Sequence, residues 1–166
     1  MENIKTEPAP RNERLERAEK KVRFYSLLGI PAGLLPLPAL DLALIGGLQL
    51  KMVHELTKIY ETPFKKSVVK SVITALVSAS TSMPTARLAA SALKIVPALG
   101  AWSGAIAMSS TSSALTYAVG KVFITHFESG ETVLTLNPKK MHQFFQEKYQ
   151  EAKAEENPLT FSGIKP

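Results

Sequence analysis

The sequence predicts an all-α protein made of helical hairpins, and three observations support this fold class. Apolar residues recur at three- and four-residue steps, most clearly between Leu42 and Tyr60. Prolines and glycines interrupt the apolar stretches and should divide them into separate helices. Only one short segment, Thr132–Leu136, has the residues of an extended strand, and a single strand cannot make a sheet.

The chain divides into three regions by composition. Residues 1–23 form a charged lead and helix, residues 24–136 an apolar helical domain, and residues 137–166 a polar helix with a tail. The helix expected over 11–23 ends in basic residues, but no aromatic residues alternate with its charges. Because bases would have nothing to stack on, we expect a solvated helix and no nucleic acid partner. The first 23 residues also lack the apolar core of a signal peptide, which predicts a cytosolic N-terminus.

The first apolar block covers residues 24–50 and cannot be one straight helix. Three prolines interrupt it: Pro31, Pro36 and Pro38. We therefore expect a helix that ends near the prolines, a turn, and a second helix that leaves it. Asp41 has two interpretations: it is the N-cap of a helix that begins at Leu42, or a buried acid that pairs with a cation or a partner.

The later elements follow from caps and breaks in the sequence. Thr62 and Pro63 predict a helix restart, with Thr62 as the cap and Pro63 at the first position. A break around Pro97 precedes a long helix over 101–127, which the glycine of the Glu128-Ser-Gly130 segment should end.

The polar region begins with Asn137 and Pro138, which predict the start of the last helix. Its apolar side chains lie along one side, which indicates a docking helix at the cytosolic edge. These are Met141, Phe144, Phe145 and Tyr149.

The stretch from Ile95 to Gly120 has no charged side chain and is long enough to enter a bilayer. Basic residues stand on both sides of each apolar block. The second block lies between Lys70 and Lys121, and Arg87 and Lys94 interrupt it before the charge-free stretch begins. Symmetric basic flanks with central prolines predict hairpins that enter the membrane and return, so that both termini face the cytoplasm. Membrane lipids are therefore an expected partner.

Small residues in the charge-free stretch suggest close helix contacts. Gly100 and Gly104 have the small-xxx-small spacing that lets two helices approach closely, and this serves self-association and packing within one chain equally well. The polar residues from Ser109 to Ser113 either line a polar path through an oligomer or hydrogen-bond within and between helices.

Motifs of catalysis and cofactor binding are missing from the sequence. There is no GxxxxGK[ST] and no GxGxxG, and His54 lacks the second histidine of a HExxH helix. Without cysteine there is no disulfide and no thiolate ligand for zinc. We expect no enzyme, no cofactor and no metal.

Four motifs carry a resemblance to a known family: PLPALD (36–41), QLKM (49–52), KIVPALG (94–100) and TYAVGKVF (116–123). In this order they make residues 30–136 similar to the YcjF-type family of bacterial proteins, also called domain of unknown function 697. The resemblance implies a membrane-associated domain that occurs in inner-membrane proteins, beside or fused to small Ras-like GTPases, with no assigned catalysis. A GTPase partner in trans is implied by this analogy alone.

The resemblance also supplies candidate residues, for which we expect architectural roles. Prolines and glycines should set the bends of the hairpins, Asp41 should cap a helix, and Gln49 should hydrogen-bond with Thr116 between helices. The full set is Pro36, Pro38, Asp41, Gln49, Met52, Pro97, Gly100, Thr116 and Gly120, to which the helix-contact pattern adds Gly104.

The leading functional hypothesis is a non-enzymatic helical protein at the cytoplasmic membrane of bacteria. It would form a homo-oligomer and act as a scaffold or anchor for a soluble partner such as a small GTPase. A mean hydropathy of only +0.04 favours the first alternative, a soluble all-helical interaction domain. The second alternative is a pore or channel component.

Overall fold

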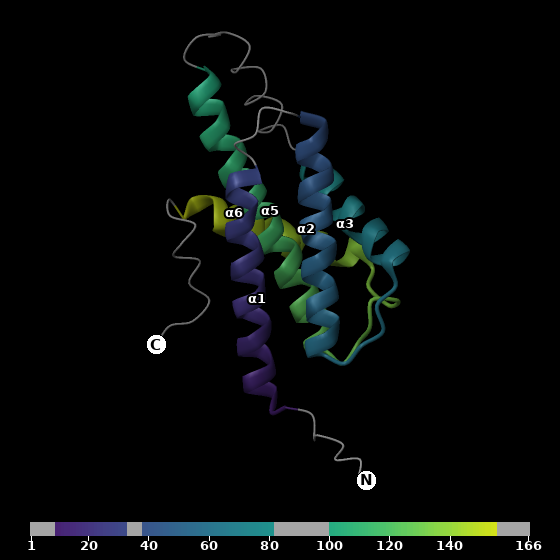
Figure 1. The fold of residues 1–166 in the computed structure, drawn as a ribbon. Helices are drawn as coiled ribbons and strands as arrows, with labels where there is room; N and C mark the ends of the chain where they lie inside the picture. The colour runs from purple at the N-terminus through teal and green to yellow at the C-terminus, as the bar shows by residue number, and fades with distance from the viewer. Residues whose placement is uncertain (1–8, 33–37, 82–99, 156–166) are drawn as a thin grey trace.

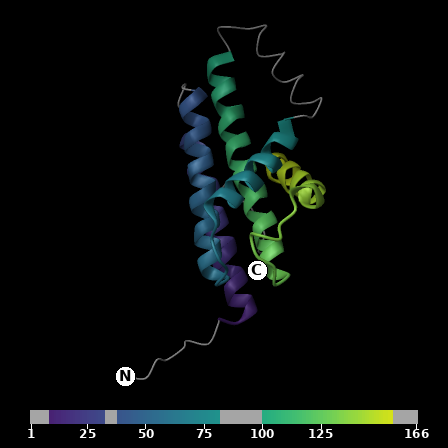
Figure 2. The ribbon, with the colours of Figure 1, turned by 90° about the vertical axis from the view of Figure 1, so that its right-hand side faces the viewer.

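The computed structural model describes residues 9–32, 38–81 and 100–155, which form α-helices joined by turns. The helices are α1 (Arg11–Ala32), α2 (Pro38–Ile59), α3 (Lys66–Thr81), α5 (Gly100–Glu128) and α6 (Pro138–Ala154). No strand occurs in these three described ranges, so the prediction of an all-α fold is confirmed for them. Figures 1 and 2 show α1, α2 and α5 along the long axis of the molecule, whereas α6 crosses this direction and is seen nearly end-on in Figure 2.

Helix α5 occupies the centre of the bundle and contacts each of the other described helices, α1, α2, α3 and α6. Between Ser112 and Gly120 every residue except Leu115 is buried. A helix that is covered on all sides needs no charged face, which explains why this part of the charge-free stretch carries none. Residues 112–120 of the charge-free stretch therefore belong to the core of the protein.

The charge-free stretch is long enough for a transmembrane helix, but the described residues do not support one. None of the helices in the described part of the chain combines the length and the apolar character needed to cross a bilayer.

Prolines stand at the end of α1 and at the start of α2, and the start of α2 corrects the role predicted for Asp41. Helix α1 continues past Pro31 to Ala32, and α2 begins at Pro38, where a missing amide hydrogen costs nothing. Asp41 is the fourth residue of α2, so its predicted role as the N-cap of a helix from Leu42 is wrong. The stripe of α2 is as predicted, with Gln49, Met52, Val53 and Leu56 all buried.

The restart expected at Thr62 and Pro63 is also wrong, because these residues end α2 instead. The amide of Thr62 donates to the carbonyl of Thr57 at 2.9 Å, and Glu61 adopts a positive φ of 52°. This is the hydrogen-bond pattern of a Schellman C-cap, with glutamate in the position that glycine usually takes. Helix α3 begins only at Lys66.

The end of α5 was predicted correctly, but the segment after it was not. Gly130 has a φ of +77°, and its amide bonds to the carbonyl of Phe127, so glycine ends the helix as expected. The segment Thr132–Leu136 is a turn rather than an extended strand, with the amide of Thr135 donating to the carbonyl of Thr132. Asn137 then caps α6 as predicted, its Oδ1 accepting from the amide of Lys139 at 3.0 Å.

Candidate functional site

The residues proposed from the sequence do not gather in one place. Pro36 and Pro97 lie outside the described residues. Pro38 and Asp41 belong to the first turn of α2, and Gly100 and Gly104 to the first turns of α5. The remaining four lie in the buried core: Gln49, Met52, Thr116 and Gly120.

Gln49 and Thr116 meet at the interface of α2 and α5. Gln49 Nε2 donates to Thr116 Oγ1 at 3.5 Å, which is the contact between helices expected from the sequence. The Thr116 hydroxyl in turn donates to the carbonyl of Ser112 at 3.0 Å. Both side chains are at most 2% exposed, so this chain of bonds serves polar groups that water cannot reach.

Gly120 does not form a bend, contrary to the prediction. It lies inside α5, where a Cβ atom would come within 2.5 Å of Val22 Cγ2 on α1. Gly29 of α1 makes a second close approach, since a Cβ there would lie 3.3 Å from Ser112 Oγ. These glycines let the backbones of α1 and α5 pack closely along an antiparallel pair.

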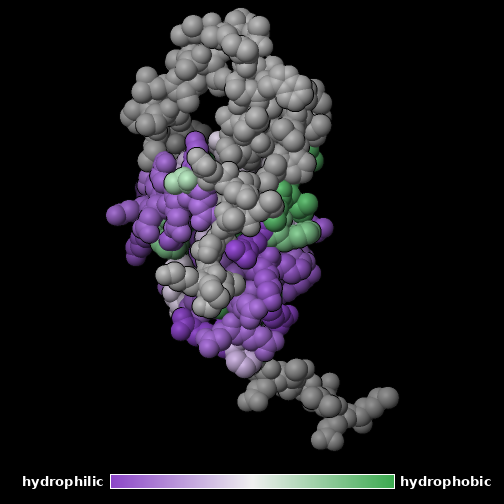
Figure 3. All heavy atoms as spheres, turned by 90° about the vertical axis from the view of Figure 1, so that its left-hand side faces the viewer, coloured by the Kyte–Doolittle hydropathy of each residue, from purple (hydrophilic) through white to green (hydrophobic). Residues whose placement is uncertain are grey.

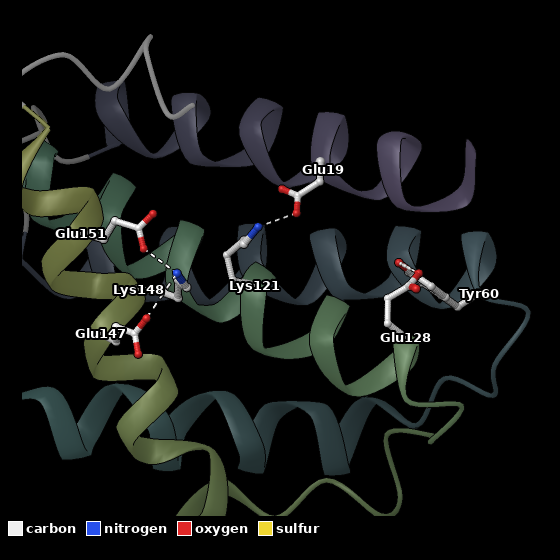
Figure 4. A network of polar contacts seen from close by, with 7 residues as sticks. All are labelled: Glu19, Tyr60, Lys121, Glu128, Glu147, Lys148 and Glu151. Carbon is white, nitrogen blue, oxygen red and sulfur yellow. Dashed lines mark hydrogen bonds and ion pairs between the residues drawn. The ribbon is translucent and has the colours of Figure 1, made fainter. Parts of the chain in front are cut away.

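A nearly buried ion pair joins the same two helices. Lys121 Nζ lies 2.5 Å from Glu19 Oε1, and the two side chains are only 17% and 11% exposed (Figure 4). An ion pair in such a setting fixes which faces of the helices meet, because either charge alone would be costly to bury.

A second polar cluster surrounds Glu128 at the end of α5. Arg11 Nε donates to Glu128 Oε2 at 2.6 Å, and the Tyr60 hydroxyl donates to Oε1 at 2.7 Å. Burial by itself would raise the pKa of Glu128, but the hydrogen bonds from Arg11 and Tyr60 and the charges of Arg11 and Arg14 hold this pKa below its usual value. Burial, reinforced by the bond to Glu128, raises the pKa of Tyr60. These contacts fasten α1, α2 and α5 together at one end of the bundle.

The apolar side of helix α6 packs against the rest of the chain. The prediction that this side is a docking surface is therefore wrong. Phe145 is fully buried, and Met141, Phe144 and Tyr149 pack against the core. The helix contacts α5 and α3. Its Lys148 lies 2.6 Å from Glu151 and 3.5 Å from Glu147, and the bond to Glu151 is the main cause that raises the pKa of Lys148 (Figure 4).

The feature that sequence analysis missed is a basic groove of about 570 Å³ between α1 and α2. Four cations and one carboxylate line it, together with one aromatic and one aliphatic side chain. The lining residues are Arg17, Lys20, Lys21 and Phe24 of α1 with Glu55, Lys58 and Ile59 of α2.

Glu55 organises the two walls of the basic groove. Its carboxylate lies 3.2 Å from Lys21 across the groove and 3.4 Å from Lys58 on its own helix. The hydrogen bond from Lys21, with a smaller contribution from Lys58, lowers the pKa of Glu55 against the opposing effect of burial. A signal for the groove was present in the sequence, because Arg17, Lys21 and Phe24 are spaced at four and three residues and so share one side of a helix.

No cluster of metal ligands is found in the part of the chain that the structure describes. His126, the one histidine there that is buried, has a local partner instead. Its Nε2 lies 2.9 Å from the carbonyl oxygen of Thr132 and 3.2 Å from Thr135 Oγ1. This contact holds the turn that follows α5 against the helix.

The described helices all lie within the match to one known protein family. The model of a family described as "Domain of unknown function (DUF697)" matches residues 10–154, which run from just before α1 to the end of α6. The chain belongs to the DUF697 family. The match is longer at both ends than the stretch over which the four motifs suggested it, and it includes both polar helices of this DUF697 domain.

One relative of this DUF697 domain has a descriptive name. "Magnetosome membrane protein 22" of Magnetospirillum gryphiswaldense is 29% identical over 138 residues, which cover 82% of this chain and 71% of the relative. No solved structure matches the chain. Neither the family description nor the relative's name mentions a GTPase, so a GTPase partner stays a prediction.

Proposed function

We propose that this DUF697 domain is a non-enzymatic bacterial protein that associates with the cytoplasmic membrane and holds a soluble partner there. The observation that carries the proposal is the similarity to a protein named for a membrane, which extends over 82% of the chain. Because this similarity includes most of the helical bundle, it favours a shared mode of association over a shared short motif.

The surface of the bundle supports contact at the membrane surface. Large apolar side chains are exposed on the outside of α1 and α2: Phe24, Leu28 and Leu44. Figure 3 shows an apolar patch in green beside extensive hydrophilic surface in purple on one face of the molecule. Exposed apolar residues next to cations are typical of helices that lie in the interface between lipid and water.

The role as scaffold or anchor needs a partner and a means of assembly. The resemblance to the YcjF-type family, whose members occur beside or fused to small Ras-like GTPases, supports a small GTPase in trans as the partner. For assembly, the small-xxx-small spacing of Gly100 and Gly104 in the first turns of α5 would let a second copy of the chain approach closely, although it serves packing within one chain equally well. Replacing both glycines with leucine should lower the mass of the assembly measured by light scattering, and an unchanged mass would remove this contact from the proposal.

An all-helical interaction domain that works away from membranes is the second candidate. The extensive core around α5 favours it, since residues 112–120 of the charge-free stretch are nearly all buried in protein. A pore is less well supported, because Ser112 and Ser113 are buried against α1 near Gly29 instead of lining a path.

Cell fractionation tests the proposed membrane association. The full chain with a small terminal tag should sediment with membranes at low ionic strength. Release by high salt would show that charges hold the protein on the membrane. Release only by alkaline carbonate would show that it is bound at the surface by other contacts. Release only by detergent would show that it is an integral membrane protein. Recovery of the whole protein in the supernatant at low ionic strength, before any wash, would refute membrane association and select the second candidate.

A further inference from the structure

We propose that the basic groove between α1 and α2 binds the phosphate groups of anionic phospholipids, while Phe24 and Leu28 enter the boundary of the acyl chains. This inference rests on the proposed membrane association and adds the class of lipid and the surface that meets it. The described structure supports it through charge, through accessibility, and through the position of the apolar residues.

The charge of the basic groove suits an anion. Its lining includes four cations and the single carboxylate of Glu55. Lys21 and Lys58 share that carboxylate, while Arg17 forms no ion pair within the described ranges. The groove therefore keeps an excess of positive charge, and it presents donors from two helices to one ligand.

The cations of the basic groove are exposed enough to contact the surface of a membrane. The side chains of Lys20 and Lys58 are 68% and 60% exposed, and that of Lys21 is 44% exposed. Lys20 pairs with Glu16 one turn earlier on the solvated side of α1. An exposed pair of this kind contributes little, so a phosphate can displace it at small cost.

Apolar side chains continue the same side of α1 beyond the cations. Phe24 follows Lys21 by three residues and Leu28 follows Phe24 by four, so the three lie along one stripe. Phe24 is 55% exposed and Leu28 is 39% exposed. On α2, Leu44 is exposed on the outside of the neighbouring helix. A membrane offers both matching environments, with phosphates beside the cations and acyl chains beside the apolar residues.

This order of groups favours lipid over other polyanions. Nucleic acid binding would call for several aromatic platforms along a basic track, but one aromatic side chain borders the basic groove. An acidic protein could satisfy the cations, but it would not by itself explain exposed phenylalanine and leucine on the next turns.

Vesicle co-sedimentation with the full chain tests the inference. One set of vesicles contains phosphatidylcholine alone and the other equal parts of phosphatidylglycerol and phosphatidylcholine. The groove variant combines Arg17→Gln, Lys20→Gln and Lys58→Gln. Its matched control removes three exposed lysines from the start of α3 and the loop before it, by Lys65→Gln, Lys66→Gln and Lys70→Gln.

The expected result is binding to the anionic vesicles more than tenfold tighter than to phosphatidylcholine, weakening as NaCl increases. Each cation at an anionic surface contributes about fivefold, so the groove variant should bind about a hundredfold more weakly. The control variant should lose less than tenfold. Glu55→Gln should strengthen binding severalfold, because it removes the one carboxylate among the described lining residues of the groove.

The apolar part of the surface has a separate pair of variants. Phe24→Ala should weaken binding to anionic vesicles about tenfold, from the apolar area that no longer leaves water. Leu134→Ala is the matched control, since Leu134 is 58% exposed in the turn between α5 and α6 and should not affect binding. Circular dichroism of each variant checks that the bundle remains folded.

Several results would overturn the inference, and they separate it from the proposed function. Equal binding to both kinds of vesicle, or equal losses in the groove and control variants, would overturn the lipid site and leave membrane association standing. Complete displacement by inorganic phosphate, but not by chloride at the same ionic strength, would make the groove a free-phosphate site. Absence of vesicle binding with native membranes still bound would point to an acidic protein as the ligand. Absence of both would refute the proposed function as well.

Discussion

Replacing Gly120 with alanine tests the closest contact in the bundle. A Cβ atom at this position would lie 2.5 Å from Val22 Cγ2 and 2.6 Å from Val22 Cγ1. Both distances are far below van der Waals contact, and Val22 is fully buried and branched at Cβ, so its methyl groups have no free rotamer to turn into. The two helices must therefore separate locally, or Val22 must leave its rotamer.

Two opposing effects set the size of the change. Alanine in place of a helical glycine stabilises by about 1 kcal/mol. Overpacking a core with one methyl group costs about 1–3 kcal/mol, and the upper part of that range applies here because both Val22 methyls collide. We expect a net loss of about 1–2 kcal/mol in the free energy of unfolding. For a chain of this length that lowers Tm by about 3–6 °C.

Urea denaturation followed by circular dichroism measures this loss of stability. Gly47→Ala in α2 is the matched control, since nothing lies within 4 Å of a Cβ at that exposed position, and it should gain about 0.5–1 kcal/mol. Val22→Ala should restore part of the stability of the Gly120→Ala variant, which a double-mutant cycle detects. If Gly120→Ala stabilises the protein as much as Gly47→Ala does, then α1 and α5 are not in close contact at this point.

Three further predictions concern buried polar groups. Thr116→Val leaves the amide of Gln49 without its partner and should cost about 1–3 kcal/mol, whereas adding Gln49→Leu should recover much of it; a double variant less stable than either single one contradicts this. Because the pKa of Glu128 is lowered in the folded chain, its contribution to stability is present above the ordinary value of 4.5 and disappears as the pH falls through the folded pKa. The free energy of unfolding of the wild type should therefore exceed that of Glu128→Gln by less as the pH falls, which denaturation at several pH values measures. A difference that stays constant with pH would show that Glu128 is not held ionised by its partners. Lys121→Met leaves Glu19 nearly buried without a cation and should cost about 2–4 kcal/mol, most of which a second change, Glu19→Leu, should restore. A loss in Lys121→Met no larger than that of an exposed ion pair would show that Glu19 is well solvated.

Local signals predicted the helices well and their exact ends less well. The cap at Asn137 and the glycine stop at Gly130 are short-range features, and both have the expected geometry. Thr62 and Pro63 carry a start signal too, but the C-cap at Glu61 takes up the Thr62 amide before a new helix can begin. Competition between a cap that ends one helix and a cap that starts the next depends on geometry that the residue types alone do not contain.

Most contacts between helices that are far apart in the sequence could not be predicted from the sequence. The apolar stripe of α2 showed which side would be buried, and the bond of Gln49 was anticipated from the resemblance. The pairing of Glu19 with Lys121 was not, because 102 residues separate them and many other charges could have served. Gly120 was assigned to a bend for the same reason, since glycine at a crossing and glycine at a turn look alike until the partner helix is known.

The charge-free stretch shows why composition alone cannot distinguish a core helix from a membrane helix. Both environments exclude water, and both favour small residues where helices approach closely. Between residues 112 and 120 of α5 the surrounding helices cover nearly every side chain, so this part of the stretch leaves no apolar surface for lipid. Among the described residues, contact with a bilayer would have to come from side chains that are exposed on the outside of the bundle. Among the described residues, Phe24, Leu28 and the cations of the basic groove combine exposure with the right chemistry, which is why the vesicle experiment is directed at them.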